Sequence, residues 1–159
     1  MSTYRLLLFG VALSAQRCLA GEVQDRYASV VDEFIAAPFL PPNEPFADPD
    51  RVLGPPDGRT VAVGLGGALT VRFFRDIPDG RGPDLRIVEI GPDGTRAWIA
   101  VSADGTSFVE SPIPATDGAP TDIDLADLGL DRASFVRVRG ADDLGLDPGF
   151  DIDAVEALH

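Results

Sequence analysis

The sequence predicts an all-β fold, an antiparallel β-sandwich or a barrel. Three observations predict it: short segments in which apolar and polar residues alternate, turn-forming residues between them, and a near-regular spacing along the chain. The composition agrees, because the 159 residues include 17 glycines and 14 prolines, which favour many turns. A hydrophobic content of 45% supplies a core, and the length suits one domain.

The predicted strands follow one another from about position 60 to the end of the chain. Alternation is clear in residues 68–74, where every second side chain is apolar. Residues 97–102 and 107–110 flank Asp104-Gly105, which predicts a hairpin because Asp-Gly readily adopts the positive φ angles of a tight reversal. Further strands are expected at 85–90, 134–139 and 150–158, while 123–130 fits a short strand or one helical turn.

Residues 1–20 have the features of a signal peptide. Arg5 supplies a positive start, an apolar run follows at 6–15, and small residues precede a cut after Ala20. The apolar run is too short to span a bilayer, so we expect an exported protein, secreted, periplasmic or at the cell surface, and not an integral membrane protein. Cleavage would remove the sole cysteine, Cys18, which leaves no disulfide.

The next part of the chain is less regular. In residues 21–44 the apolar spacing fits a helical face and a first strand equally well, and both remain open. Prolines crowd residues 38–56, which predicts a long loop without regular structure. The β-sandwich domain itself is expected to cover residues 45–159.

The charge is strongly acidic. Thirteen basic residues, all of them Arg, face 26 acidic residues, of which 20 are Asp and 6 are Glu. Such a field repels phosphate groups, so we expect no nucleic-acid partner, and anionic membranes are poor partners. Asp is a good turn former and also a hard oxygen ligand for Ca²⁺, and both uses fit the excess of Asp.

Several stretches, taken in order, resemble the galactose-binding-like (discoidin-like) jelly-roll domains of bacterial extracellular and cell-surface proteins. The resemblance covers roughly residues 45–158, and the stretches that carry it are 52–58, 65–73, 79–85, 101–108, 135–139 and 149–155. It implies a β-sandwich of two antiparallel sheets, frequently a structural Ca²⁺, and commonly a role in attachment to carbohydrate or to a surface.

The resemblance also implies where a metal would lie, namely where the loop entering the sandwich meets the final strand. The candidate ligands there are Asp50, Asp57, Asp151, Asp153 and Glu156. Asp151 and Asp153 share one face of their strand, opposite the apolar residues 150, 152 and 154. If that face is covered, the two carboxylates need a cation or an arginine as partner. The candidate arginines are Arg137 and Arg139, which lie on the neighbouring predicted strand.

A second acidic candidate lies in a glycine-rich loop. Asp76, Asp79 and Asp84 have a spacing that suits Ca²⁺, and turn formation explains the same residues. The candidate ligand-binding residues are Trp98 and Asp84. Trp98 lies in a predicted strand, so it is either a core residue or an aromatic platform for a sugar.

The sequence has few of the side chains that enzymes commonly use for catalysis. The one histidine is the terminal His159, and there is no Lys for a phosphate-binding loop. We therefore expect a secreted, non-catalytic binding module, stabilised by Ca²⁺, that attaches to glycan or cell-surface material. The alternatives are a structural or interaction protein of the envelope or matrix without a small ligand, and a carboxylate-dependent glycosidase.

Overall fold

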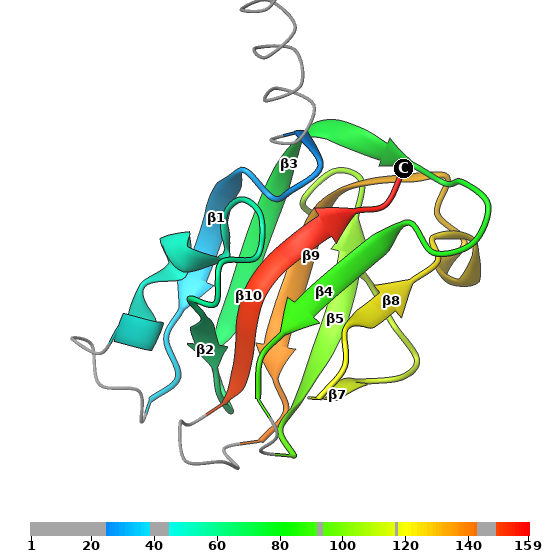
Figure 1. Ribbon diagram of the computed structural model, residues 1–159. Coiled ribbons are helices and arrows are strands. Elements are labelled where there is room, and N and C mark those ends of the chain that lie inside the picture. Colours follow the sequence, from blue (N-terminus) through cyan, green and yellow to red (C-terminus); the bar gives the residue numbers. More distant parts are fainter. Residues whose placement is uncertain (1–24, 39–44, 92–93, 117, 143–148) are drawn as a thin grey trace, which may run out of the picture.

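The computed structural model describes residues 25–38, 45–91, 94–116, 118–142 and 149–159. Within these residues the chain forms two antiparallel sheets packed face to face, which confirms the predicted all-β sandwich (Figure 1). The six-stranded sheet has the order β1-β3-β9-β5-β6, with β7 also paired to β5. Its strands are β1 (Val30–Ile35), β3 (Ala68–Pro78), β5 (Arg96–Ser102), β6 (Val109–Glu110), β7 (Ala115–Thr116) and β9 (Arg132–Gly140).

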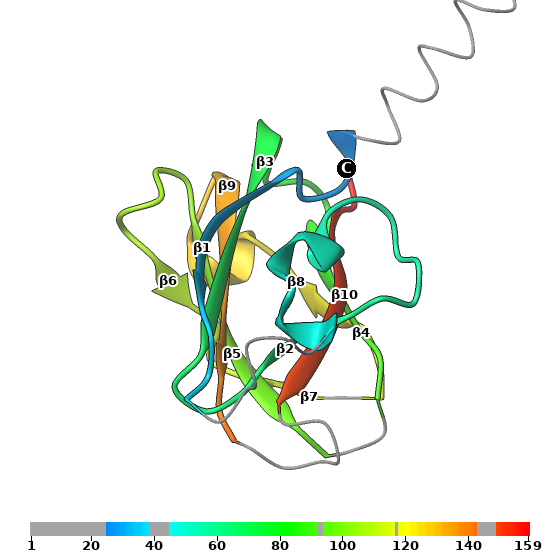
Figure 2. The same cartoon turned by 90° about the vertical axis from the view of Figure 1, so that its left-hand side faces the viewer.

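The second sheet has four strands in the order β2-β10-β4-β8. They are β2 (Val61–Val63), β4 (Leu85–Glu89), β8 (Thr121–Ile123) and β10 (Phe150–Ala157). The view in Figure 2, turned by 90°, shows β10 and β4 on one side of the sandwich and β1, β3 and β9 on the other.

The core fills the space between the two sheets. Alternate residues of β3 and β5 face alternate residues of β4 and β10, and all are buried. The largest fully buried side chains include Leu69, Val71, Ile99, Val101, Leu85, Ile87, Phe150 and Ile152. Each such side chain stabilises the fold by about 1.5–3 kcal/mol relative to an exposed one, so this interior holds the sandwich together without any disulfide among the described residues.

The strands expected from alternation are present, with small differences at their ends. The Asp104-Gly105 hairpin is confirmed, since β5 and β6 pair on either side of it and Gly105 has a φ of +75°. Residues 123–130, left open between a strand and a helical turn, divide into the end of β8 and the 3₁₀ helix η3 (Ala126–Leu128).

Residues 21–44, for which a helix and a strand were equally expected, contain the strand β1. This strand pairs with β3 at the edge of the six-stranded sheet, with Phe34 opposite Leu69 and Ile35 opposite Ala68. The sandwich therefore includes residues on the N-terminal side of position 45.

The proline-rich stretch is more regular than predicted. It contains two 3₁₀ helices, η1 (Pro45–Ala47) and η2 (Pro49–Val52), so the prediction of no regular structure was wrong. The Asp48 side chain caps η2 by accepting the Asp50 N–H at 3.2 Å, and Pro49 has no N–H to satisfy in the first turn. Val52 at the end of η2 is fully buried in the core and fastens this stretch to the sandwich.

The last strand, β10, changes its inward face along its length. Phe150 and Ile152 belong to the core, but its pairing with β4 shifts register between Ile152 and Ala154. The extra residue of this bulge turns Val155 and Ala157 into the main core cluster, whereas the predicted Ala154 is also fully buried but lies outside that cluster.

None of the helices in the described part of the chain is long and apolar enough to cross a bilayer. The predicted signal peptide, residues 1–20, lies outside the described residues.

Candidate functional site

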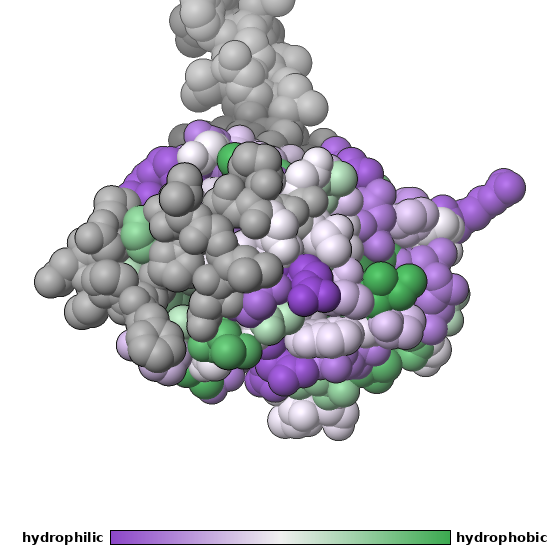
Figure 3. Space-filling view, turned by 90° about the horizontal axis from the view of Figure 1, so that it is seen from below, coloured by the Kyte–Doolittle hydropathy of each residue, from purple (hydrophilic) through white to green (hydrophobic). Residues whose placement is uncertain are grey.

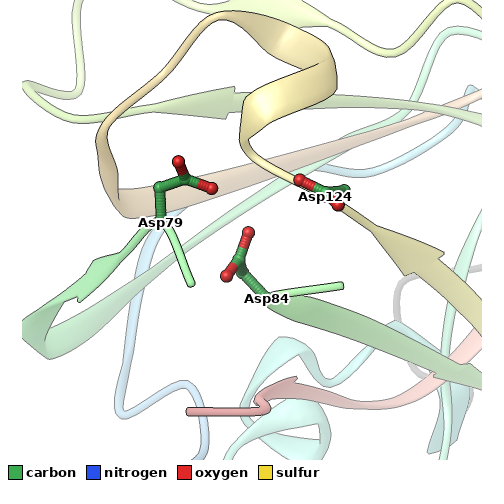
Figure 4. A group of neighbouring side chains, drawn as sticks. All are labelled: Asp79, Asp84 and Asp124. Carbon is green, nitrogen blue, oxygen red and sulfur yellow. The ribbon is translucent and has the colours of Figure 1, made fainter. Parts of the chain in front are cut away.

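Three aspartates from three different segments meet beside the end of β3 (Figure 4). Asp79 follows β3, Asp84 immediately precedes β4, and Asp124 immediately follows β8. One carboxylate oxygen from each lies within 4.8 Å of the others. We call Asp79, Asp84 and Asp124 the acidic triad. Among the described residues it is the one group of three or more Asp, Glu, His or Cys side chains this close together.

Asp84 anchors the acidic triad. Its carboxylate is 0% exposed and accepts the N–H of Gly80 at 2.7 Å through Oδ1 and the N–H of Leu125 at 2.8 Å through Oδ2. Its backbone N–H donates to Ile123 O, and its own carbonyl accepts the Leu158 N–H. A buried charge is costly without partners, and these two N–H donors supply them while joining the β3–β4 loop to the η3 segment.

The acidic triad has the chemistry of a site for a hard cation. Each Asp84 oxygen accepts one N–H and keeps a second lone pair, while Asp124 is half-buried and Asp79 exposed. All three ligand groups are carboxylates, which suit Ca²⁺ or Mg²⁺ and not Zn²⁺, and backbone carbonyls and water ordinarily complete such a shell. The His159 imidazole approaches Asp84 Oδ1 at 3.6 Å through Nε2. The acidic triad can therefore hold a metal ion.

The second acidic candidate was thus partly located by the sequence. Asp79 and Asp84 come together as expected, but Asp76 turns away and binds Ser134 Oγ at 2.5 Å and the Arg132 guanidinium at 3.4 Å. Asp124 was missed. Its place follows from the pairing of β4 with β8, in which Leu85 lies opposite Ile123, so that Asp84 and Asp124 become neighbours. Pairing between distant strands is not readable from local alternation.

The other predicted metal site has a different geometry. The Asp153 carboxylate, 3% exposed, accepts the N–H groups of Asp57 and Gly58 at 3.1–3.2 Å. The final strand and the entering loop therefore do meet, as the resemblance implied. They meet through backbone donors, however, and the Asp57 carboxylate is exposed and accepts the Arg59 N–H at 2.9 Å.

The other residues predicted for this metal site, Asp50, Asp151 and Glu156, lie in different environments. Asp50 is exposed in η2, and Asp151 is buried near the start of β10. Glu156, near the end of β10, forms an ion pair with Arg26 at 3.0 Å. The assignment of Asp50, Asp57, Asp151, Asp153 and Glu156 as metal ligands stays a prediction.

The expected arginine partners of Asp151 and Asp153 lie elsewhere, so that expectation was wrong. Arg137 and Arg139 are in β9, whereas β10 pairs with β2 and β4 in the other sheet. Both arginines point out from the six-stranded sheet. Arg137 binds Thr70 Oγ1 at 3.0 Å and Glu33 at 3.5 Å, and Arg139 pairs with Glu110.

Trp98 lies on this same outward face. Its neighbours along β5, Ala97 and Ile99, belong to the core, whereas Trp98 is partly exposed and lies opposite Arg139 of β9. The core alternative for Trp98 is therefore excluded. The next outward position of β5, Ala100, lies opposite Arg137.

An aromatic ring and a guanidinium also stack on this face of the sheet. The Arg137 guanidinium carbon lies 3.9 Å from the centroid of the Phe108 ring, which is a cation–π contact. We call the surface formed by Trp98, Phe108, Glu110, Arg137 and Arg139 the outer sheet face. It combines partly exposed ring surface with hydrogen-bonding groups of both kinds, donors on the arginines and acceptors on Glu110, while the buried Thr70 holds Arg137 from within the sheet.

Figure 3 views the end of the sandwich that is lowest in Figure 1. Hydrophobic residues appear there as separate groups among hydrophilic ones. Exposed apolar side chains occur singly at several strand ends, for example Ile35, the last residue of β1, and Ile90, which follows β4. Such scattered residues are ordinary on a protein surface.

Comparison with known proteins gives matches in structure only. No protein-family model matches the chain, and no curated protein matches it. One similar solved structure is CBM32-1 from a family 31 glycoside hydrolase of Clostridium perfringens, with 11% identity and a TM-score of 0.54 over 84% of this chain and 97% of that one. Another is the CBM32 of AlyQ in complex with 4,5-unsaturated mannuronic acid, with 14% identity and a TM-score of 0.52 over 83% of this chain and 98% of that one. The chain therefore has the galactose-binding-like jelly-roll β-sandwich fold that its sequence resembles.

Proposed function

We propose that the protein is an exported, non-catalytic carbohydrate-binding module that attaches to glycan or cell-surface material through its outer sheet face. The observation that carries this proposal is the position of Trp98, which stands outside the core, opposite Arg139, on the sheet face that also carries the Phe108–Arg137 stack. The fold supports it, since the two similar domains are carbohydrate-binding modules and almost their whole length is matched.

The outer sheet face has the groups that a sugar ring needs. An indole ring packs against the C–H face of a pyranose, while charged and hydroxyl groups around it bond the hydroxyls. Arg137 is held in place by Thr70, Glu33 and the Phe108 ring. Because these side chains are already ordered, a sugar loses little affinity to their immobilisation.

We also propose that Ca²⁺ binds the acidic triad and has a structural role. The ion would offset two of the three negative charges and connect the β3–β4 loop to the segment before η3. The set that includes Asp153 is the competing location. Asp153 already has two backbone donors, whereas the acidic triad has more negative charge than its donors offset.

A glycan-array screen of the purified protein and of Trp98→Ala tests the binding function. We expect the unaltered protein to bind a subset of glycans and Trp98→Ala to lose most of that signal. The matched control is Phe74→Ala, because Phe74 is 69% exposed on β3, roughly 20 Å along the strand from Ala68, the β3 neighbour of Arg139. Unchanged binding by Trp98→Ala would contradict the proposed surface.

Two other results of the same screen would replace the proposal. Binding to no glycan, together with self-association in solution, would favour the structural or interaction protein. Release of reducing ends from a bound glycan would favour the carboxylate-dependent glycosidase.

A further inference from the structure

We propose that a groove beside the acidic triad is a second saccharide site, separate from the outer sheet face, and that it takes a protonated amino-sugar residue. The groove lies between the loop that follows β6 and the β8–η3 segment, and its volume is about 220 Å³. This inference rests on the proposed carbohydrate-binding function and adds to it a second place and a class of ligand.

One wall of the groove is apolar. Ile113, which is 72% exposed, contributes from the loop, and Leu128 contributes from η3 while packing on the core. Covering the exposed Ile113 side chain is favourable because it removes apolar surface from water. The C–H face of a sugar ring can provide this cover. The volume suits a single ring, since pockets for larger ligands are ~300–1,000 Å³.

The polar lining accepts hydrogen bonds far more than it donates them. Asp122, Asp124 and Asp127 are among the residues that line the groove, and no Lys or Arg is among its lining residues in the part of the chain that the structure describes. Arg86 neutralises Asp122 from outside the groove through two bonds at 2.7 and 2.8 Å. Asp124 belongs to the acidic triad and accepts the Ala126 N–H at 3.0 Å. The charge that remains for the groove is that of Asp127, to whose side chain no group among the described residues donates a hydrogen bond.

Both walls are already fixed in place. The Ser111 hydroxyl donates to Ile113 O at 3.0 Å and accepts the Ile113 N–H, and the Ser111 N–H donates to Ile99 O in β5. On the opposite side η3 ends at Gly129, whose φ of +68° suits glycine. A groove with fixed walls loses little entropy on binding.

The charge of the groove selects among sugars. A uronic acid would be repelled by Asp127, and a neutral hexose would leave the charge of Asp127 uncompensated. An ammonium group supplies three donors and the opposite charge, and its charge-assisted bonds are the stronger kind. The geometry therefore points to a 2-amino-2-deoxyhexose, with its ammonium toward Asp127 and its C–H face toward Ile113.

The test uses calorimetric titration with a tetramer of glucosamine and a tetramer of N-acetylglucosamine. It is made in the Trp98→Ala background, so that the outer sheet face contributes nothing. We expect binding of the glucosamine tetramer, about tenfold weaker binding after Asp127→Asn, and weaker binding in high salt. Asp131→Asn is the matched control, since Asp131 is also exposed but lies outside the groove, and it should bind as before.

Three results would overturn the inference. They are no binding of glucosamine in the Trp98→Ala background, equal binding of the N-acetylated tetramer, and unchanged affinity in Asp127→Asn. Each leaves the proposed function standing if the array screen shows binding that depends on Trp98. Full competition by a lysine peptide would show that the groove recognises charge without the sugar, which also contradicts the inference.

Discussion

Asp84 and Asp153 are two buried carboxylates that fasten loops to the same four-stranded sheet. Asp84 accepts the N–H groups of Gly80 and Leu125, and Asp153 accepts those of Asp57 and Gly58. They differ in what stands around them. Asp84 has Asp79 and Asp124 within 4.8 Å, whereas Asp153 belongs to no such group among the described residues. Backbone N–H donors are thus the hydrogen-bond partners that the described residues show for Asp153, whereas Asp84 also has two further carboxylates beside it. These additional carboxylates indicate a site for a cation.

The largest expected effect comes from removing Asp84. Asp84→Ala leaves the buried Leu125 N–H and the less buried Gly80 N–H without their acceptor, and leaving a buried N–H unsatisfied costs about 1–3 kcal/mol. We expect the free energy of unfolding in EDTA to fall by about 3 kcal/mol, measured by denaturant titration. The exposed Asp131→Ala serves as control. Stability equal to that of the unaltered protein would show that Asp84 does not hold the two loops together.

The free energies of unfolding of Asp153→Ala and Asp124→Asn, measured with and without Ca²⁺, distinguish the two carboxylates. Asp153→Ala should lose about 2 kcal/mol in both buffers, because its partners are N–H groups. Asp124→Asn should match the unaltered protein in EDTA and lack its gain in Ca²⁺, which is about 2.7 kcal/mol at a hundredfold excess over the dissociation constant.

The opposite pattern would assign the metal to the other predicted site. If Asp153→Ala abolishes the gain from Ca²⁺ and Asp124→Asn keeps it, the ion binds the set of Asp50, Asp57, Asp151, Asp153 and Glu156.

The smallest expected effect concerns the hairpin turn at Asp104. Its carboxylate accepts the N–H groups of Thr106 and Ser107 at 2.8 Å, and these bonds hold its pKa well below the usual value. Because the folded pKa is depressed, the stabilisation is present above about pH 4 and is lost as the pH falls below that. Asp104→Asn should therefore reduce the drop in melting temperature between pH 5 and pH 2.5 by a few degrees at most. An unchanged drop would mean that Asp104 adds nothing to the acid sensitivity.

The sequence predicted those parts of the molecule that depend on local pattern. Alternation located β3, β5, β9 and β10, and Asp-Gly located the hairpin, because each signal lies within one segment of chain. The bulge that turns Val155 into the main core cluster left no local signal. Asp79 and Asp84 were readable as a candidate pair because they lie in one loop.

What the sequence could not supply was contact between distant segments. Asp124 joins Asp84 only through the β4–β8 pairing, and the loop donors of Asp153 lie about a hundred residues away in the chain. The same limit misplaced Arg137 and Arg139, which were expected beside Asp153 and instead lie opposite Ala100 and Trp98 in the other sheet. The pairing of strands decided which charges became neighbours.

Trp98 is the single tryptophan of the chain, so its fluorescence reports directly on the proposed binding surface. Titration with a glycan that the array identifies should shift or quench the indole emission in a saturable way, with the same dissociation constant as calorimetry. Binding of that glycan with no change in indole emission would contradict the central claim that the outer sheet face is where the sugar lies.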